Sequence, residues 1–560
     1  MHEIAVSIHQ MLDQLPPASP RISVVIATLN RRDALRRTLQ TLFEQDLPSD
    51  QYEIIVVDDG STDGTSAGLR QSKARCAFRV ITQPNRGQAA ARNAGYRASR
   101  GEIVLFLDDD MLCEPQLLRE HLRAHEGSQS SVVFGPTPPA AESPDSILLD
   151  RLTTDAEQTA QRLSGNPTAV FPDDTMLCSN TSLPRRLIDA SHGFDERFFR
   201  WYEDIEYGVR LRNRGISFRY QPRAWAFHFF VKSTDAVVAG QFYCGKNSVL
   251  LCRTHPALRR HSLLTPLDDG PNWKRWLRIA AIRAPVLARA LLTPAFRIAN
   301  RLRRVRVMRR AAILLHGLRC RSEFFRGAIE EAGSVAAYSR EFGARLRILR
   351  YEHLGACADA DRPDCCIEFA EFHRQMHWMA DSGYTPITAV DWLRWCDGGA
   401  ELPAKPVLLL LNGDCEAIIQ RGLQCVASCG LRASILLGTR GPRRMSVTQI
   451  RHWAKTGWDF VIEVQERSGS ACVSPGELHR QIAMTRRYIE TASETPVRLL
   501  SLRPGHSPMP ETLCDSFETA FGPAAGINDL HTNAWDLRTV TILNSDGLAQ
   551  IRSVLLKGHR

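Results

Sequence analysis

Short apolar runs alternate with amphipathic stretches over the first 110 residues of the chain. The apolar runs are rich in β-branched residues and predict buried strands over 22–27, 52–57, 78–82 and 103–107. Helical spacing of leucines or small residues predicts helices over 31–44, 65–72 and 88–99. This alternation predicts an α/β domain of βαβ units, with a parallel sheet covered by helices on both faces.

A second alternating pattern begins near residue 346. Its apolar runs predict strands over 346–351, 407–411, 433–437, 460–464 and 497–502. Its amphipathic stretches predict helices over 369–382, 447–456 and 476–491. Together they predict a second α/β unit, compatible with a distorted (β/α) barrel. Between the two patterns, 130–175 reads as loops and strand pieces, and we expect helices over 184–190 and 203–213.

The stretch that precedes the second pattern is strongly basic. Residues 270–322 hold Lys274 and 13 Arg without an Asp or Glu, in a chain whose net charge is +10. We expect basic helices here, broken near Pro285 and Pro294. Arginines interleaved with aliphatic residues suit a helix on anionic lipid headgroups, so an anionic membrane surface is the expected partner. Nucleic acid is not expected, because no aromatic stacking platform lies beside them; a helical pack between the two units is the alternative.

The remaining composition excludes several classes of protein. With 44% hydrophobic and 24% charged residues the chain is not largely disordered, and it has no solenoid repeat. The 15 cysteines form no CxxC pair, which disfavours a structural zinc site or a disulfide framework and favours a reducing compartment. Residues 1–20 read as a short helix, not a secretory signal, and no apolar stretch approaches ~18 residues. We expect a cytoplasmic protein, with peripheral attachment at the inner face of the cell membrane as an alternative.

Polar residues follow three of the predicted strands: Thr28 and Asn30, then Asp58 and Asp59, then Asp108, Asp109 and Asp110. In open parallel sheets, ligands bind outside the carboxyl ends of the strands. Three adjacent carboxylates are costly to crowd unless a cation or hydrogen-bond donors compensate them. Oxygen ligands suit Mg²⁺ or Mn²⁺ bridging a diphosphate. A solvated turn that caps a helix is the alternative for the Asp run alone.

The first unit resembles the family 2 glycosyltransferases, which have the GT-A fold. The resemblance covers roughly 21–230 and rests on five segments in the family's order: VVIATLNRRDALRRTL, IIVVDDGSTDGT, NRGQAAARNAGYRAS, IVLFLDDDM and GFDERFFRWYEDIEYGVRLRNRG. Each segment is moderately specific, and the ordered set is highly specific. The resemblance implies a Rossmann-like domain that binds a nucleoside diphosphate sugar.

The resemblance assigns roles to five residues of the donor pocket. It implies that Thr28 and Asn30 line the nucleotide pocket. It implies that Asp58 or Asp59 accepts a hydrogen bond from the base or the ribose. Arg92 would face the phosphates as a fixed cation, and a surface arginine on a helix is the alternative.

The Asp run matches the family's DxD motif. The resemblance implies that Asp110 binds the metal, Mg²⁺ or Mn²⁺, and that Asp108 binds the ribose or the metal. Asp109 is expected in the donor site beside them. His228, in WAFHFF, falls where related enzymes often place a metal-proximal histidine, and a satisfied core histidine is the alternative. The metal would offset the charge that builds on the departing nucleoside diphosphate.

Glu203 and Asp204 match the family's ED motif at the start of a predicted helix. The resemblance implies that Asp204 is the general base that takes the proton of the acceptor hydroxyl. A single base with in-line attack implies inversion at the anomeric carbon. Glu203 and Asn180 are expected to contact the acceptor or the donor. For Asp204, a carboxylate stabilised by a helix N-terminus is the alternative.

The second unit, over roughly 345–545, resembles the polysaccharide deacetylases of the NodB-homology type. The matching segments are IEFAEFHRQMHWMADSGYTPIT, KPVLLLL and MSVTQIRHWAKTGWDF. Asn412 and Gly413 replace the two carboxylates of the family's TFDDG-like motif, and Glu463 and Arg467 replace its HxxxH-type pair. We therefore expect an inactive domain, since the metal loses its imidazole ligands. A substitute oxygen site from Asp414, Glu463 and Glu466 is the alternative, and His506 receives no catalytic role.

These inferences predict an inverting, metal-dependent glycosyltransferase of the hexosyl or N-acetylhexosaminyl type. It would transfer a sugar to a glycan or lipid-linked acceptor in cell-surface polysaccharide biosynthesis. The alternatives are a bifunctional glycosyltransferase and deacetylase, or a non-catalytic scaffold that binds sugar nucleotides. The expected organisation is a helix (1–20), a GT-A domain (21–265), a basic helical linker (266–325) and a deacetylase-like domain (326–560).

Overall fold

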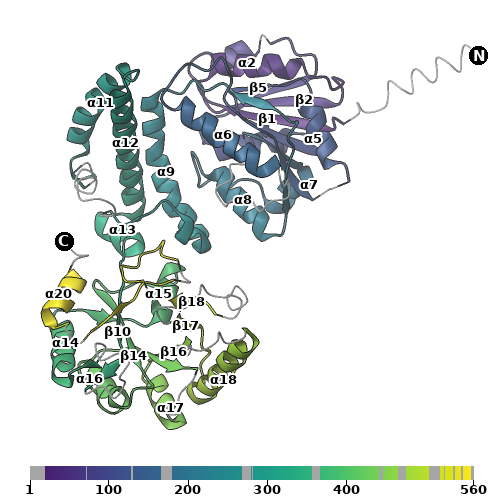
Figure 1. The fold of residues 1–560 in the computed structure, drawn as a ribbon. Helices are drawn as coiled ribbons and strands as arrows, with labels where there is room; N and C mark the ends of the chain where they lie inside the picture. Colours follow the sequence, from purple (N-terminus) through teal and green to yellow (C-terminus); the bar gives the residue numbers. More distant parts are fainter. Residues whose placement is uncertain are drawn as a thin grey trace, which may run out of the picture. The chain divides into compact units, whose positions relative to one another are not determined.

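The chain folds into two compact units, residues 1–251 with 276–330 and residues 252–275 with 331–560 (Figure 1). The structure, a computed structural model, describes 19–556 apart from 71, 128–129, 165–178, 268–278, 281, 356–365, 440–444, 465–474, 503–516, 523, 534–535 and 544–545. The helix expected over 1–20 thus lies outside the described residues, except for its last two positions. The described residues of the basic stretch, from 279 on, lie in the first unit.

The first unit is built on a seven-stranded sheet of order β3-β2-β1-β4-β7-β6-β8. Its strands are β1 (Ile22–Thr28), β2 (Tyr52–Asp58), β3 (Ala77–Thr82), β4 (Ile103–Leu107), β6 (Ser131–Phe134), β7 (Asn180–Pro184) and β8 (Ser217–Tyr220). The first four are parallel, and β7 runs antiparallel to both β4 and β6. A small ribbon pairs β5 (Met111–Cys113) with β9 (Ala226–His228). The predicted parallel core is therefore confirmed.

Alternate residues of β1 face the two helical layers of this unit. Ile22, Val24 and Ile26 pack with the helices of one layer, and Val25 packs with the other. The first layer contains α2 (Arg32–Phe43) and α5 (Leu117–His125). The second contains α4 (Gln88–Ala98), α7 (Arg185–Ser191) and α8 (Glu203–Asn213), while α3 (Thr65–Leu69) follows β2.

One helix of the first unit contradicts the sequence prediction. Residues read as loops and strand pieces include α6 (Leu149–Ser164). Leu149, Leu152 and Ala156 recur at helical spacing there. Eight polar or charged residues surround them between 149 and 160, so the apolar stripe is too narrow to stand out.

Three helices pack together here: α9 (Thr234–Thr254), α11 (Pro285–Arg301) and α12 (Arg306–Ala332). The basic stretch supplies α11 and the first part of α12. Pro285 begins α11 as predicted, but Pro294 lies inside it, so the break expected there is wrong. Phe296 and Ala299 of α11 pack against Ala312 of α12. This packing holds α11 against α12 and keeps α11 helical despite Pro294. Among the described residues, no helix is both long enough and apolar enough to cross a bilayer.

The backbones of α9 and α12 touch at two glycines. A Cβ on Gly245 would lie 1.8 Å from the carbonyl oxygen of Phe324. A Cβ on Gly327 would lie 1.9 Å from the carbonyl oxygen of Phe242. Real Cβ atoms do not approach oxygen so closely, so this crossing requires glycine on both helices.

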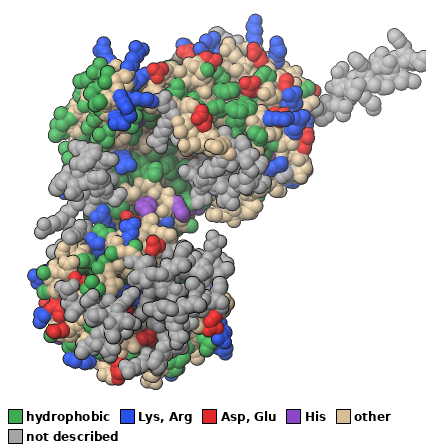
Figure 2. All heavy atoms as spheres, viewed as in Figure 1, with side chains coloured by type: hydrophobic (Ala, Val, Ile, Leu, Met, Phe, Trp, Pro, Cys, Tyr) green, Lys and Arg blue, Asp and Glu red, His purple; other side chains and the backbone are tan. Residues whose placement is uncertain are grey.

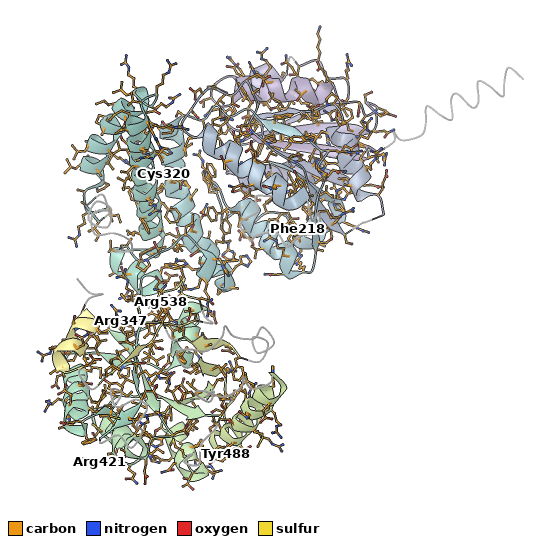
Figure 3. The ribbon with its side chains drawn as sticks, in the orientation of Figure 1. Phe218, Cys320, Arg347, Arg421, Tyr488 and Arg538 are labelled. Carbon is orange, nitrogen blue, oxygen red and sulfur yellow. The ribbon has the colours of Figure 1, made fainter. Side chains whose placement is uncertain are left out.

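The second unit contains an eight-stranded parallel sheet with the main order β18-β17-β16-β15-β14-β10-β19. Its strands are β10 (Arg347–Tyr351), β13 (Thr385–Pro386), β14 (Pro406–Asn412), β15 (Ser434–Gly438), β16 (Asp459–Val464), β17 (Leu499–Leu502), β18 (Thr519–Phe521) and β19 (Val540–Thr541). This sequential order is typical of a (β/α) barrel. Within the described residues no pairing joins β18 to β19, so the sheet is a partial barrel. Figure 3 labels Arg347, which begins β10, and Arg421, which follows β14 along the chain.

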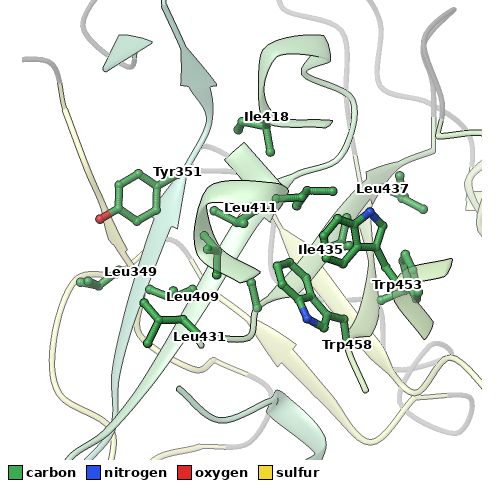
Figure 4. Packing of buried hydrophobic residues seen from close by; sticks show 14 of the residues in the cluster. Leu349, Tyr351, Leu409, Leu411, Ile418, Leu431, Ile435, Leu437, Trp453 and Trp458 are labelled. Carbon is green, nitrogen blue, oxygen red and sulfur yellow. The ribbon is translucent and has the colours of Figure 1, made fainter. Parts of the chain in front are cut away.

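Helices surround this second sheet. They are η1 (Pro256–His261), α13 (Val335–Phe342), α14 (Phe369–Asp381), α15 (Ala389–Cys396), η3 (Ile418–Gly422), α16 (Leu423–Ser428), α17 (Val447–Lys455), α18 (Pro475–Ser493) and α20 (Leu548–Leu556). The core joins Leu409 and Leu411 of β14 to Ile435 of β15 and to the rings of Trp453 and Trp458, which lie 4.4 Å apart at an angle of 43° (Figure 4).

A short ribbon of β11 (His353–Leu354) and β12 (Cys366–Ile367) lies beside this core. Cys366 is disulfide-bonded, whereas nine other described cysteines are free. Free thiols thus predominate where the structure is described, as expected for a chain without a disulfide framework.

Candidate active site

Three parallel strands bring the predicted polar residues to one edge of the first sheet. β1 lies between β2 and β4, and Thr28 is in register with Asp58. The Thr28 hydroxyl donates to Oδ2 of Asp109 at 2.7 Å. The N–H of Asp59 donates to the carbonyl oxygen of Thr28 at 2.9 Å. The three polar groups therefore form one cluster at the carboxyl ends of the strands.

Asp58 and Asp59 bind the loops that follow β2 and β3. Asp58 accepts from the N–H of Ser61 at 2.9 Å and is buried. Asp59 accepts from the N–H groups of Arg86 and Gly87, each at 2.9 Å. These carboxylates fix the two loops that border the edge, and the loops' own donors occupy their oxygens.

Asn30 turns the chain between β1 and α2. Its φ is 55°, in the left-handed region that asparagine adopts more readily than most residues. Its side-chain oxygen accepts from the N–H of Thr62 at 2.7 Å, and its own N–H donates to Ser61 at 2.8 Å. Asn30 is exposed and joins the loop after β1 to the loop after β2.

Arg31 is a site residue that the sequence analysis missed. Its guanidinium forms an ion pair with Asp110 and lies 3.5 Å from Asp109. The Asp110 oxygen that Arg31 contacts, Oδ2, also lies 3.2 Å from Nε2 of His228. The register of β5 with β9 places this histidine, because Met111 pairs with His228. The one sequence signal that could have identified Arg31 is its position directly after Asn30, in a strand-to-helix turn.

The two carboxyl groups beside Arg31 differ in pKa. Burial raises the pKa of Asp109 to about 7, and the charge of Asp110 adds to this shift. Burial also opposes ionisation of Asp110, but the hydrogen bond and charge of His228 and the charge of Arg31 prevail. They lower the pKa of Asp110 to about 2. Asp110 is therefore the carboxylate of this pair that stays ionised at neutral pH.

Arg92 of α4 connects the Asp run to the ED motif. Its guanidinium donates to Oδ1 of Asp108 at 3.0 Å and forms an ion pair with Glu203. Arg92 is only 3% exposed, which excludes the surface arginine considered as an alternative. A buried guanidinium thus lies between carboxylates that are 95 positions apart in the chain.

Glu203 and Asp204 form the first turn of α8 and are almost fully buried. Burial raises the pKa of Glu203 to about 7; Arg92 opposes this shift, and the charge of Asp204 adds to it. Burial also raises the pKa of Asp204, against the charge of Arg92. Oδ1 of Asp204 accepts from the N–H of Ile205 at 2.8 Å. A carboxylate with a raised pKa is a stronger base than an ordinary one.

A strained turn leads into this acidic pair. Trp201 and Tyr202 have φ values of 68° and 70°, which are uncommon for large side chains. The Asn247 amide on α9 donates to the carbonyl oxygen of Arg200 and, at 2.8 Å, to that of Trp201. Ser248 donates to the Tyr202 hydroxyl at 2.9 Å. α9 therefore holds the backbone that orients Asp204, and no local sequence pattern signals this role.

Asn180 lies on β7 inside the domain and is 2% exposed. Its amide nitrogen donates to the carbonyl oxygen of Ala224 at 2.8 Å, and its oxygen lies 2.8 Å from Nε2 of His121. Burial lowers the pKa of His121 to about 4, so this imidazole is neutral at pH 7. The Asn180 side chain thus bonds to core partners next to the strand edge.

The acidic edge can supply part of a divalent-metal site. Among the described residues, no three His, Cys, Asp or Glu side chains converge as a metal site. Asp110 and His228 nevertheless present an oxygen and a nitrogen 3.2 Å apart. Mg²⁺ in phosphate-transfer sites commonly takes one or two protein ligands and completes its shell with substrate phosphates and water. The residues present therefore fit a metal that binds together with a diphosphate.

A known protein family matches the part of the chain that forms this site. Residues 23–184 match the family model described as "Glycosyl transferase family 2". This part of the chain is a family 2 glycosyltransferase domain. The matched range includes Thr28, Asp58 and the Asp run, whereas Glu203 and Asp204 come after its last residue.

One relative is the validoxylamine A glucosyltransferase of Streptomyces hygroscopicus subsp. jinggangensis. It is 34% identical over 234 residues, which cover 37% of this chain and 54% of that one. The chain thus spans about half the length of the relatives it matches first. A solved structure is that of a mannosyltransferase from Pyrobaculum calidifontis in complex with GDP-Man and Mn²⁺. The two chains are 18% identical with a TM-score of 0.36, and the match covers 58% of this chain and 93% of the mannosyltransferase. The Streptococcus pyogenes deacetylase PplD, in complex with acetate, is 12% identical, covers 38% of this chain and 98% of that chain, and has a TM-score of 0.34.

Proposed function

We propose that the first unit transfers a sugar from a nucleoside diphosphate sugar to a hydroxyl of a glycan or lipid-linked acceptor, with inversion. The observation that carries this proposal is the buried guanidinium of Arg92, which joins Asp108 at the strand edge to Glu203 in the ED motif. It supports a donor site and a base within one cluster. A role in cell-surface polysaccharide synthesis fits this chemistry.

The reaction needs a base at the acceptor and positive charge at the donor. The acceptor oxygen would form a bond to the anomeric carbon as the bond from that carbon to the diphosphate oxygen breaks. Asp204 would take the proton of the attacking hydroxyl, and burial, which raises its pKa, makes it more basic. Arg92 would hold the acidic pair in place, and Arg31 lies close enough to the Asp run to turn to an incoming diphosphate.

The proposed cofactor is Mg²⁺ or Mn²⁺, held by Asp110 and His228 with Asp108 beside them. Such a cation would neutralise charge on the leaving nucleoside diphosphate. Imidazole favours Mn²⁺ over Mg²⁺, which prefers oxygen ligands. Asp110 suits this role because it is ionised, whereas Asp109 is directed to Thr28.

The proposed activity is tested by titrating nucleoside diphosphate sugars into the full chain and measuring binding and donor hydrolysis. One donor, with a particular nucleobase and a particular sugar, should bind more tightly than the others. This donor should be hydrolysed slowly when no acceptor is present. Binding without hydrolysis or transfer by any donor would favour the non-catalytic scaffold instead.

Asp110→Ala should abolish metal-stimulated donor binding and lower turnover by about 100-fold or more, because it removes the ionised carboxylate of the proposed site. Donor binding is measured with and without Mn²⁺, and turnover with excess chelator. Asp33→Ala is the control, since Asp33 is an exposed carboxylate on α2. Full activity of the unsubstituted protein in excess chelator would exclude the metal.

The second unit is proposed to have no deacetylase activity. Arg350 of β10 is 2% exposed and forms ion pairs with Glu463 of β16 and with Glu352. It also donates to Ser501 at 3.1 Å. The guanidinium thus neutralises carboxylates that could otherwise bind a cation, which argues against the substitute oxygen site. Asp414, also considered for that site, accepts a hydrogen bond from the N–H of Gly438 at 2.8 Å. Glu466, the third residue considered, lies outside the described residues, as do Arg467 and His506.

Gly413→Asp should fail to create a metal site and should destabilise the chain by about 1–3 kcal/mol through overpacking. A Cβ at this position would lie 2.7 Å from Ile435 and 2.8 Å from the carbonyl oxygen of Leu436. Asn412→Asp is the matched control, because it adds a carboxylate without adding volume. Acetate release from acetylated amino-sugar oligomers and bound transition metal are measured on the full chain. Chelator-sensitive acetate release by the unsubstituted protein would support the bifunctional alternative.

A further inference from the structure

The turn between α11 and α12 exposes a group of aliphatic side chains. We call residues 297–310 the hairpin tip. Four aliphatic side chains here are 49–67% exposed: Ile298, Leu302, Val305 and Val307. Hydrophobic and basic side chains gather over this hairpin in Figure 2. Single exposed aliphatic residues are ordinary, but a contiguous group marks a surface that another body covers.

Acidic residues from the first unit neutralise part of the basic stretch. The ion pairs are Arg289–Glu323, Arg297–Asp235, Arg319–Asp235 and Arg303–Asp145. Four exposed arginines of the tip have no acidic side chain within ion-pair distance in the part of the chain that the structure describes. They are Arg301, Arg304, Arg306 and Arg310. The basic surplus is therefore concentrated where the aliphatic residues are exposed.

A hollow of about 510 Å³ opens beside the tip. Arg301, Arg303 and Arg304 line it. Arg303 is paired with Asp145, which also lines the hollow, whereas Arg301 and Arg304 have no acidic partner among the described residues. Guanidinium groups bind phosphate oxygens in a bidentate way, so this lining suits a phosphate group. Asp235 also lines the hollow, but Arg297 and Arg319 neutralise its charge.

We propose that the hairpin tip docks on an anionic phospholipid bilayer. The four aliphatic side chains enter the boundary between headgroups and acyl chains, and the four unpaired arginines bind lipid phosphates around them. Each component matches one layer of the membrane surface, since apolar side chains and cations both favour binding at an anionic interface. This surface is independent of the proposed transfer chemistry, although it would bring the domain to a lipid-linked acceptor.

Two other occupants fit this surface less well. A second copy of the chain would cover the aliphatic side chains but would bring two sets of unpaired arginines together. Nucleic acid would satisfy the arginines but would gain little from the aliphatic side chains, because stacking on single strands needs aromatic rings. An anionic bilayer is the partner that uses both features.

The test is co-sedimentation of the full chain with vesicles of phosphatidylcholine, alone or mixed with phosphatidylglycerol. We expect binding to the mixed vesicles that weakens as salt rises, because exposed charges are screened within ~8–10 Å near physiological ionic strength. Replacing Arg301, Arg304, Arg306 and Arg310 by Gln should lower the partition coefficient by about 100-fold or more. Replacing the four aliphatic residues by Ser should remove the binding that persists at high salt.

The matched control replaces Arg36, Arg70, Arg75 and Arg223 by Gln. These arginines are exposed and lie in the same unit, so the control loses the same charge outside the tip. It should bind mixed vesicles nearly as well as the unsubstituted protein. Equal binding to both vesicle types, equal loss in both variants, or tip-dependent dimerisation without vesicle binding would overturn the proposal. Tip-dependent binding to DNA without vesicle binding would also overturn it. Donor hydrolysis without vesicles should be the same in all variants, which separates this proposal from the transferase proposal.

Discussion

Asp204→Asn should leave donor affinity nearly unchanged and lower sugar transfer by ~10²–10⁴-fold, the usual effect of removing a general base. The amide has the same shape and can still accept from the N–H of Ile205, so the first turn of α8 should keep its geometry. It cannot take the proton of the acceptor hydroxyl. Donor affinity is measured by calorimetry, and transfer by product formation with a verified acceptor.

The control for this prediction is Glu203→Gln, which changes the neighbouring carboxylate in the same way. Burial raises the pKa of Asp204, the proposed base, so transfer by the unsubstituted protein should begin to fall at a higher pH than an ordinary aspartate would give. A buried acid with a raised pKa is protonated at a higher pH than usual, and a protonated carboxyl cannot act as a base. If Asp204→Asn keeps full transfer while Glu203→Gln loses it, Glu203 is the base.

Arg92→Met should lower the free energy of unfolding by about 3–5 kcal/mol, because it leaves buried carboxylates without their cation. Methionine fills much of the same volume, so the loss reports the charge more than a cavity. Glu203 and Asp204 are 2% and 5% exposed and have little access to water. Stability is measured by denaturant unfolding monitored by circular dichroism.

The pH dependence separates this electrostatic effect from a packing effect. Burial already raises the pKa of Glu203, and removing Arg92 removes the charge that opposes this shift. Lowering the pH should therefore protonate Glu203 and recover part of the lost stability. The double variant Arg92→Met with Glu203→Gln should also recover part of it. A loss that is the same at every pH and in the double variant would contradict this account.

The strands of the first sheet could be predicted closely from the sequence. Strands buried on both faces are continuously apolar, so the runs at 22–27, 52–57 and 103–107 mark β1, β2 and β4 to within one residue. α6 was missed because its apolar stripe is narrow. Pro294 was misread because tertiary packing holds α11 together, and no local pattern reports such packing.

Residues of the candidate site that directly follow a strand could be predicted from the sequence. Residues whose partners lie far away in the chain were missed. Thr28, Asp58 and Asp108 could be assigned because strand ends are visible in sequence. Asn247 could not, because its contacts reach back 46 residues to the turn at Trp201. Arg350 could not either, because its partner Glu463 lies 113 residues away in another strand. Pairings of this kind depend on the folded topology and leave no periodic signal.

The glycine contacts between α9 and α12 set the reach of the enzyme. Phe324, whose carbonyl oxygen touches Gly245, lies 18 residues after Arg306 at the start of α12. At the rise of an α-helix this is about 27 Å, and Asn247 next to that contact holds the turn before Asp204. If the hairpin tip docks upright on a bilayer, as proposed, α12 would be a spacer between the lipid surface and Asp204, the proposed base. A sugar attached directly to its lipid would fall short of Asp204, whereas the end of a longer oligosaccharide would reach it.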